Sequence, residues 1–474
     1  MSHRYARGFT LTELLISIAI ALILILGIAT VFRLTGETIG AGMALSASTR
    51  DQRAAQTVFA TDFGGLANTN PGIAIWSGTT LGYLDPATRD QDPLRDSQPS
   101  ANRTRFRTDR LGMFVTGEFH RQSGNDNYLT SDVTADQAYV WYGHLLLPDN
   151  GGAFFYNGNA NQPILPGSIN PNAGSTFSTN PNNYFARQWT LGRVALLMKT
   201  KDASGQILDK AGTPQYFIDD DNSTTNDMRP FMYNSPATND PATAKPRVQE
   251  SRYDLVGLNG TSTDTFARVA SKLVGTWWNF LDYPFQADPY PQRPLTSAGA
   301  AKTAPLFLPG ASDFITEFAG DYVTQVSTGT DMGDVSAPLP DGVIDFAVEK
   351  FDPSDDATWI KQVRYYGFPR DVNGDGLIDG DRDVIPFKWF VSAATFEKNE
   401  GTSTEFDDKP ASFPGTPLAV THPSAATNRQ YVTAWTSADA PTIWPKLIRV
   451  TYTMQDAQGR LRNPQPVEMI FKVN

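Results

Sequence analysis

Residues 7–33, RGFTLTELLISIAIALILILGIATVFR, decide the architecture of the chain. From residue 14 to residue 32 every side chain is apolar or small, apart from the weakly polar Ser17 and Thr30. At about 1.5 Å per residue this run forms a helix of roughly 28 Å, close to the roughly 30 Å hydrocarbon core of a bilayer. The run therefore predicts a helix that spans a membrane.

Basic residues flank this apolar run unevenly. Arg4 and Arg7 precede it, and Arg33 follows it. The positive-inside rule therefore favours a cytoplasmic N-terminus and places the bulk of the chain on the other side of the membrane. A secretory signal peptide has a shorter apolar core that is followed by small residues at the cleavage point. Here the small residue, Gly8, comes before the apolar run instead.

The order of residues in RGFTLTE, with basic residues, then Gly8, Phe9 and Glu13, resembles the class III leader of type IV pilins and type II secretion pseudopilins. The resemblance implies that residues 1–8 are a leader, which a prepilin peptidase removes by cleavage between Gly8 and Phe9 on the cytoplasmic face. It also implies N-methylation of the new amino group on Phe9. The alternative is an ordinary uncleaved signal anchor.

Glu13 stands at the entrance of the apolar run, where a carboxylate needs an explanation. An ionised side chain within a membrane costs on the order of 2.5–3.5 kcal/mol or more, so such residues usually have a partner. In the family that the segment RGFTLTE resembles, the partner of this glutamate is the N-terminal ammonium of a neighbouring subunit. The resemblance therefore implies that Glu13 sets the axial register between subunits. In an uncleaved anchor, Glu13 would be an incidental interfacial residue.

The helix is expected to continue beyond the membrane, with residues 9–33 as its membrane-spanning and assembly half and residues 34–65 as its amphipathic half. Three- and four-residue spacings predict one apolar stripe in the second half, formed by Ala55, Val58, Phe59 and Leu66. Charged residues fall largely off this stripe, namely Arg50, Asp51, Arg53 and Asp62. Gly64 and Gly65 are a plausible stop.

Residues 66–474 read as a β-rich globular ectodomain with long loop insertions, and 38 Gly and 33 Pro suit such a protein. Residues 138–148, 189–199, 363–369 and 387–394 resemble strands in composition, and residues 264–281 predict one further helix. Alternating apolar residues predict a C-terminal hairpin of residues 446–454 and 467–473, with a turn at residues 456–459. The predicted fold class is α+β: a long N-terminal helix packed on a large antiparallel, loop-rich ectodomain.

Residues 371–383, DVNGDGLIDGDRD, form the strongest chemical motif of the ectodomain. Hard oxygen ligands at alternate positions around a glycine predict a structural Ca²⁺ loop. The expected ligands are Asp371, Asn373, Asp375, the carbonyl of Leu377, Asp379, and Asp381 or Asp383 to close the shell. Arg382 replaces the usual Glu, and strand-like flanks argue against an EF-hand. Calcium-stabilised loops occur in some pseudopilins; the alternative is a solvated acidic turn. The weaker acidic clusters at residues 219–222 and 341–345 are expected to be solvated loops.

Several classes of function fit the sequence poorly. The net charge of −11 opposes binding to nucleic-acid phosphates. The chain has no cysteine, which excludes disulfides, thiol nucleophiles and thiolate metal sites. Its four histidines are isolated in sequence, and no nucleotide-binding, metalloprotease or nucleophile-elbow motif occurs. His144 lies in an apolar strand-like run and is expected in the core. We therefore do not expect an enzyme.

These observations favour a minor pilin or pseudopilin that primes or caps the tip of a fibre, closest in outline to the PilW/PulJ group. A bulky ectodomain would crowd the lateral contacts of a major subunit. The resemblance implies other pilin subunits, the prepilin peptidase and an inner-membrane assembly platform as partners. It also implies an inner-membrane protein with a periplasmic ectodomain, which then enters a pilus or pseudopilus. The alternatives are an adhesin delivered by the pilin helix, and a bitopic membrane protein with no filament role.

Overall fold

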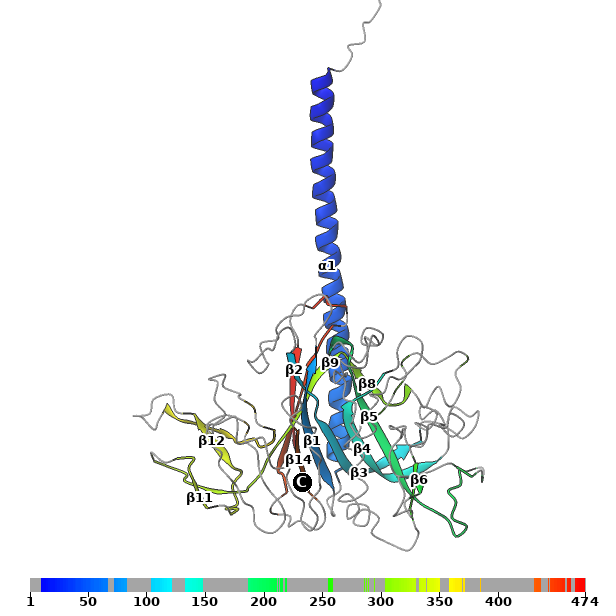
Figure 1. Ribbon diagram of the computed structural model, residues 1–474, viewed down its shortest axis with the longest axis vertical. Helices are drawn as coiled ribbons and strands as arrows, with labels where there is room; N and C mark the ends of the chain where they lie inside the picture. Colours follow the sequence, from blue (N-terminus) through cyan, green and yellow to red (C-terminus); the bar gives the residue numbers. More distant parts are fainter. Residues whose placement is uncertain are drawn as a thin grey trace, which may run out of the picture.

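A computed structural model shows two parts, a long N-terminal helix that stands out like a stem and a wide β-rich head around its C-terminal end (Figure 1). The structure describes residues 10–66, 72–82, 104–121, 133–147, 186–210, 255–258, 303–329, 332–337, 339–349, 358–368, 430–435, 444–456, 458–461 and 465–473. It also describes shorter pieces at 212, 214–215, 218–219, 285, 287, 289, 294, 370, 384 and 442. The α+β class predicted from the sequence is confirmed.

The helix α1 (Leu11–Gly64) has 54 residues, a length of about 80 Å. It is one continuous helix, and the glycines at positions 36, 40 and 42 do not interrupt it. Each internal glycine costs up to about 1 kcal/mol relative to alanine, but the flanking apolar and alanine-rich turns keep the hydrogen-bonded helix intact. The long helix predicted from the sequence is therefore present.

The larger sheet of the head has nine described strands in the order β14–β1–β3–β4–β5–β7–β6, with β2 beside β1 and β8 beside β5. All neighbours are antiparallel except the pairs β5–β7 and β6–β7. The bounds of these strands are β1 (Ile73–Gly82), β2 (Thr104–Arg107), β3 (Arg110–His120), β4 (Thr134–His144), β5 (Thr190–Thr200), β6 (Ile218–Asp219), β7 (Leu255–Leu258), β8 (Leu306–Pro309) and β14 (Gln430–Trp435).

A second sheet has the order β16–β15–β9, formed by β9 (Ala311–Ala319), β15 (Leu447–Met454) and β16 (Gln465–Lys472). The predicted C-terminal hairpin is confirmed, since β15 and β16 pair antiparallel with Val450 opposite Met469. The expected turn is also present, because the Gly459 N–H donates to the Asp456 carbonyl at 2.8 Å. That turn is only part of a longer connection between the two strands.

Two small ribbons complete the described strands, β10 (Thr324–Gln325) with β11 (Val335–Ala337), and β12 (Phe346–Glu349) with β13 (Ile360–Val363). The predictions at residues 138–148 and 189–199 correspond to β4 and β5. The prediction at residues 363–369 is wrong as a single strand, because β13 ends at Val363 and Tyr366 pairs with Phe318 of β9 instead. The strand expected at residues 387–394 and the helix expected at residues 264–281 lie outside the described residues.

The buried titratable side chains of the head include His144 and Asp345. His144 at the end of β4 lies 2.9 Å through Nε2 from the carbonyl of Ala311 on β9, so it joins the two sheets and is a core residue as predicted. Asp345 corrects the expectation of a solvated loop at residues 341–345, because it is only 1% exposed. Its carboxylate accepts hydrogen bonds from the backbone N–H groups of Tyr322 and Val323 and from the hydroxyl of Tyr366.

These two groups predict opposite pH dependences. Burial lowers the pKa of His144 to about 4, so its contribution to stability is lost as the pH falls from 6.5 toward 4. Burial raises the pKa of Asp345 to about 6, so its contribution is present below pH 3.8 and is lost as the pH rises through 6. In the unsubstituted chain, protonation of His144 lowers the unfolding free energy as the pH falls from 7.5 to 4.5. His144→Gln should therefore raise the unfolding free energy at pH 4.5, relative to that at pH 7.5, by about 2 kcal/mol. Asp345→Asn should lower it, in the same comparison, by a similar amount.

Denaturant unfolding of both variants at a series of pH values measures these differences. The exposed His120 gives a matched control, because His120→Gln removes a histidine that is not buried. Parallel pH profiles for His144→Gln and His120→Gln would contradict the assignment of the acid-sensitive group.

Candidate assembly site on the N-terminal helix

The tip of α1 is closed by a reciprocal cap between Thr10 and Glu13. The Glu13 N–H donates to Thr10 Oγ1 at 3.3 Å, and the Thr10 N–H donates to Glu13 Oε2 at 3.0 Å. The Thr10 hydroxyl also donates to Glu13 Oε2, at 2.8 Å. This is a capping box, which satisfies two otherwise unpaired donors of the first helical turn. In the single chain the carboxylate of Glu13 is therefore held by its own helix.

Thr10 is a residue that sequence reasoning missed, although the spacing T-x-x-E at residues 10–13 carries the signal for a capping box. Gly8 and Phe9, the expected cleavage residues, lie outside the described part of the chain. Of the three residues predicted for processing and assembly, the structure therefore positions Glu13.

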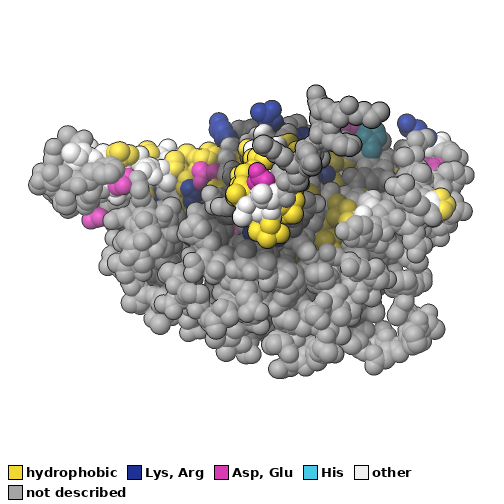
Figure 2. All heavy atoms as spheres, turned by 90° about the horizontal axis from the view of Figure 1, so that it is seen from above, with side chains coloured by type: hydrophobic (Ala, Val, Ile, Leu, Met, Phe, Trp, Pro, Cys, Tyr) yellow, Lys and Arg dark blue, Asp and Glu magenta, His cyan; other side chains and the backbone are white. Residues whose placement is uncertain are grey.

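Above the head the stem exposes an almost unbroken apolar surface. Looking down on the molecule, Figure 2 shows hydrophobic side chains around the projecting helix. Leu26 and Phe32, for example, are 70% and 73% exposed. Within the described residues, α1 is the one helix that is long and apolar enough to cross a membrane, and none of its most apolar stretch is buried by the head. Such a surface is unfavourable in water, so it requires a membrane or neighbouring helices.

Aromatic side chains hold the other end of α1 in the head. The ring of Phe59 stacks on Tyr142 of β4 with centroids 4.4 Å apart, and it meets Phe307 of β8 edge-on at 5.4 Å. One turn later, Phe63 stacks on Phe471 of β16 at 4.2 Å. These contacts reach strands of both sheets, so the helix contributes to the common core. Phe59, predicted on the apolar stripe, is fully buried.

A buried ion pair lies beside this aromatic cluster. Arg193 of β5 donates through Nε to Asp62 Oδ2 and through Nη2 to Asp62 Oδ1, both at 2.7 Å. The hydroxyl of Tyr142 donates to the same carboxylate. Burial and the charge of Asp62 raise the pKa of Tyr142 well above its usual value, so the phenol remains a donor. Burial works against the charge of Arg193, but the hydrogen bonds of Asp62 raise the Arg193 pKa.

The position of Asp62 corrects the sequence prediction, which placed it largely off the buried stripe. Asp62 is 2% exposed and lies on the same face as Ala55 and Phe59. Its charge is tolerated there because a guanidinium and a hydroxyl from two different strands satisfy both carboxylate oxygens. Hydrogen bonds and an ion pair therefore join α1 to the larger sheet through Asp62, Arg193 and Tyr142. These three residues are called the helix lock below.

The chain leaves α1 through a tight contact at Gly65. The Gly65 N–H donates to the carbonyl of Thr61 at 3.0 Å, and the Gly65 carbonyl accepts the N–H of Thr116 at 2.7 Å. A Cβ at position 65 would lie 2.5 Å from the Thr116 carbonyl oxygen and 2.7 Å from Val115 Cγ1. The helix end can therefore approach β3 this closely because residue 65 has no side chain.

We expect Gly65→Ala to lower the unfolding free energy of the head by about 1–3 kcal/mol, because backbone must move to accommodate the new methyl group. Gly64 supplies the matched control, since a Cβ there would meet nothing within 4 Å. Gly64→Ala should be neutral or stabilise by up to about 1 kcal/mol. Denaturant unfolding of the two variants compares them, and equal effects would show that the close approach to β3 does not matter.

The acidic segment predicted to bind Ca²⁺ lies outside the described residues, and so do all its expected ligands from Asp371 to Asp383. The two residues that flank it are described. Arg370 and Val384 form an isolated antiparallel bridge, with N–O distances of 3.1 and 3.0 Å. This bridge places Arg370 and Val384, the residues on either side of the acidic segment, next to each other.

Arg370 is held to the second sheet by ionic hydrogen bonds around the buried Glu317. Arg370 donates to both oxygens of Glu317 on β9, at 2.9 and 3.0 Å, and Arg449 of β15 donates to Glu317 Oε2 at 2.7 Å. Burial opposes the ionisation of Glu317, but the two guanidinium groups hold its pKa below the usual value. Across the ranges that the structure describes, no group of three or more His, Asp or Glu side chains is arranged to hold a metal ion.

One comparison with known proteins finds a match, and it falls on the tip of the stem. A family model described as the prokaryotic N-terminal methylation motif matches residues 3–29, which include Gly8, Phe9 and Glu13. No curated protein and no solved structure matches the chain. The match implies a membrane setting and assembly with other pilin subunits. The chain thus carries the methylation motif that marks type IV pilin-like proteins, a motif that points to a structural subunit and not to an enzyme.

Proposed function

We propose that the chain is a minor subunit of a type IV pilus or type II secretion pseudopilus, and that it primes or caps the tip of the fibre. The observation that carries this proposal is the exposed apolar stem, which bears the methylation motif at its tip and packs into the core of a large head at its other end. A free-standing membrane anchor needs no such packed joint. A subunit whose head must sit at a set height on a fibre needs one.

The proposed maturation starts at the leader. A prepilin peptidase cleaves between Gly8 and Phe9, and the new N-terminus of Phe9 is methylated. Thr10 then becomes the second residue of the mature chain, and its backbone N–H and hydroxyl remain in place to hold the carboxylate of Glu13. This intramolecular cap supports a role for Glu13 in two states. The carboxylate is satisfied by Thr10 before assembly and by the N-terminal ammonium of a neighbouring subunit after it.

The width of the head supports a place at the tip. Figure 1 shows strands spreading to both sides of the helix, far beyond the width of the stem. In a helical array every subunit has neighbours on all sides, so a head of this width would crowd their lateral contacts. At the tip only one side of the head faces other subunits. The proposed location is therefore the inner membrane with a periplasmic head, followed by the end of a fibre built by an inner-membrane assembly platform.

The experiment replaces Glu13 by glutamine in the natural host and measures incorporation into sheared fibres by immunoblot and immunogold labelling. Glu13→Gln should lower incorporation at least tenfold without affecting removal of the leader. The exposed Glu118 on the head supplies the control, and Glu118→Gln should leave incorporation unchanged. Labelling along the whole fibre would overturn the tip assignment. Undiminished incorporation of Glu13→Gln would overturn the role of Glu13.

We also propose that the acidic loop between Arg370 and Val384 binds Ca²⁺ in a structural role. The bridge at its base supports this, because ends held this close return the chain on itself, as a metal loop requires. The residues that would hold the ion are Asp371, Asn373, Asp375, the carbonyl of Leu377, Asp379, and Asp381 or Asp383. Bound Ca²⁺ would neutralise carboxylates that otherwise repel one another.

Thermal unfolding in Ca²⁺ and in chelator tests this proposal. With Ca²⁺ at 100 times its dissociation constant, the unfolding free energy should rise by about 2.7 kcal/mol. The double variant Asp375→Asn, Asp379→Asn should lose this response. Asp341→Asn, in another acidic segment, should keep it. A chain that melts at the same temperature in Ca²⁺ and in chelator does not use the loop for calcium.

A further inference from the structure

The second sheet of the head ends at an open edge, the strand β16. In the part of the chain that the structure describes, β16 pairs with β15 on one side and with no strand on the other. The Val473 N–H donates to the Lys446 carbonyl at 2.9 Å, and hydrogen-bonded pairs recur at every second residue of an antiparallel ladder. Odd-numbered residues of β16 therefore bond to β15, and the backbone groups of even-numbered residues point outward. Such an edge is a template for another strand.

The side chains on the outward face of β16 alternate in character. Ile470 is 52% exposed, and the exposed Glu468 and Lys472 lie two residues before and two residues after it. Glu468 has only a loose contact with Arg449, at 3.9 Å, and its side chain remains half exposed. The edge therefore carries an acidic, an apolar and a basic side chain at successive even-numbered positions.

This order of side chains is complementary to itself when two copies of β16 pair antiparallel. If Ile470 lies opposite Ile470 of a second copy, each Glu468 lies opposite a Lys472, and the interface is a two-fold symmetric one. The same three residues present their backbone N–H and C=O groups to the second copy. Centring the pair on Glu468 or on Lys472 would instead place like charges opposite each other. Charged edge residues usually oppose self-pairing, but here they favour one register.

The direction of β16 determines how the stems of two paired copies would lie. A Cβ on Gly40 would lie 3.6 Å from Cδ of Arg460, in the turn before β16, and Phe63 stacks on Phe471 near the end of the strand. The strand therefore runs in the same direction as α1. Because antiparallel pairing reverses one strand, it also reverses one stem. Two copies in one membrane or in one fibre have parallel stems, so they cannot pair in this way.

We propose that β16 pairs antiparallel with β16 of a second copy on an opposing fibre, so that the two tips join head to head. The inference goes beyond the proposed function and rests on it for the position of the head at the tip. Two tips that meet have stems pointing in opposite directions, as this pairing requires. Strand addition at a sheet edge supplies backbone hydrogen bonds, and the alternate side chains supply the specificity.

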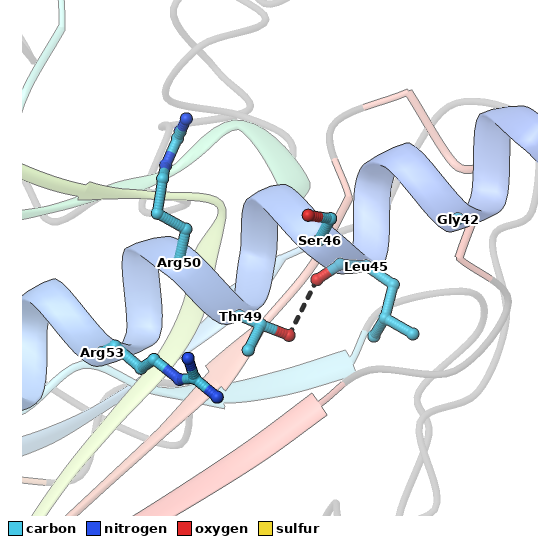
Figure 3. Close-up of a pocket in the computed structure, with 6 residues that line it drawn as sticks. All are labelled: Gly42, Leu45, Ser46, Thr49, Arg50 and Arg53. Carbon is cyan, nitrogen blue, oxygen red and sulfur yellow. Dashed lines mark hydrogen bonds between the residues drawn. The ribbon is translucent and has the colours of Figure 1, made fainter.

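The edge of β16 is separate from the exposed surface of α1, which the proposed function requires for assembly into the fibre. A hollow on that surface is lined by Gly42, Leu45, Ser46, Thr49, Arg50 and Arg53 (Figure 3). None of these residues belongs to β16. One molecule can therefore use α1 within its own fibre and β16 toward another.

Charge reversal tests the pairing on the full-length chain in detergent, with dimerisation measured by sedimentation equilibrium. Glu468→Lys and Lys472→Glu each turn both ion pairs into repulsions, so each should weaken dimerisation roughly tenfold or more. An equimolar mixture of these two variants should restore dimers, because every charge then meets its opposite. Glu118→Lys makes the same charge change at an exposed site on the other sheet and should have no effect.

The absence of cysteine from the chain allows the register to be tested separately, because an introduced cysteine is the only thiol. Ile470→Cys would lie opposite its counterpart at a Cα–Cα distance of about 5.5 Å, within reach of a disulfide. Lys472→Cys would be displaced from its counterpart by about 13 Å along the strand. Under mild oxidation, Ile470→Cys should give several times more linked dimer than Lys472→Cys.

In the natural host, Glu468→Lys should enter fibres normally but abolish tip-to-tip junctions, which immunogold labelling of the head locates in electron micrographs. Mixing cells that carry Glu468→Lys with cells that carry Lys472→Glu should restore the junctions. A monomer at every concentration, or single variants whose mixture stays monomeric, would overturn the inference, while normal fibre incorporation leaves the proposed function standing. If the unsubstituted chain never enters a fibre, the proposed function fails and the joining of fibres fails with it.

Discussion

Replacing Asp62 by alanine should lower the free energy of unfolding of the head by about 3–5 kcal/mol. The carboxylate accepts two hydrogen bonds from Arg193 and one from Tyr142. Its removal leaves a guanidinium that is only 19% exposed without a counter-charge, and a buried hydroxyl without an acceptor. The loss is large because both groups were desolvated when the chain folded. Denaturant unfolding of the full chain in detergent, followed by tryptophan fluorescence, measures the change.

Asp51 supplies the control for this experiment, because it pairs with Arg50 on the same helix but at the surface. Exposed ion pairs contribute about 0–1 kcal/mol, so Asp51→Ala should change stability little. The double variant Asp62→Leu, Arg193→Met should recover part of the loss, since it removes both charges together. If Asp62→Ala and Asp51→Ala are equally stable, the helix lock does not hold α1 to the sheet.

Replacing Phe59 by alanine should lower the free energy of unfolding of the head by about 3–5 kcal/mol. The ring is fully buried and contacts aromatic rings from several strands, with Tyr142 and Phe307 the nearest. The cavity left behind would lie where the helix meets both sheets, so neither sheet can close it without moving the other. The stem should also become looser in the head, which faster hydrogen exchange of the last turns of α1 would reveal.

Phe32→Ala is the matched control, because it makes the same change at a position that is 73% exposed on the stem. Its effect on the unfolding of the head should be close to zero. Because Phe59 and Asp62 lie on the same face, their combined loss is expected to differ from the sum of the single losses. A loss below about 1 kcal/mol for Phe59→Ala would show that the head folds without using the helix as part of its core.

The local features of the fold could be predicted from the sequence. The unbroken apolar run and the three- and four-residue spacings determine α1, and they also select Phe59 as a buried residue. In the C-terminal hairpin, Ile448, Val450 and Tyr452 alternate with more polar neighbours, and all three are buried. These signals are readable because the periodicity of a helix or a half-buried strand depends on residues close together in the chain.

The features that depend on distant residues could not be predicted. Asp62 meets Tyr142 and Arg193, which are 80 and 131 residues away in the sequence, so its charge alone suggested an exposed position. Asp345 is buried for a similar reason, since the groups that satisfy its carboxylate come from residues 322, 323 and 366. The order of the nine-stranded sheet likewise follows from long-range pairing. Periodicity reports which face of an element is buried, not what lies against it.

The most direct test of the central claim is the mass and N-terminal sequence of the protein from a host with, and from a host without, its prepilin peptidase. With the peptidase, the mature chain should begin at Phe9 and carry one additional methyl group on its N-terminus. Without the peptidase it should keep residues 1–8. A chain that still begins at Met1 in the presence of an active peptidase would contradict the proposed role as a fibre subunit, and the stem would then serve only as a membrane anchor.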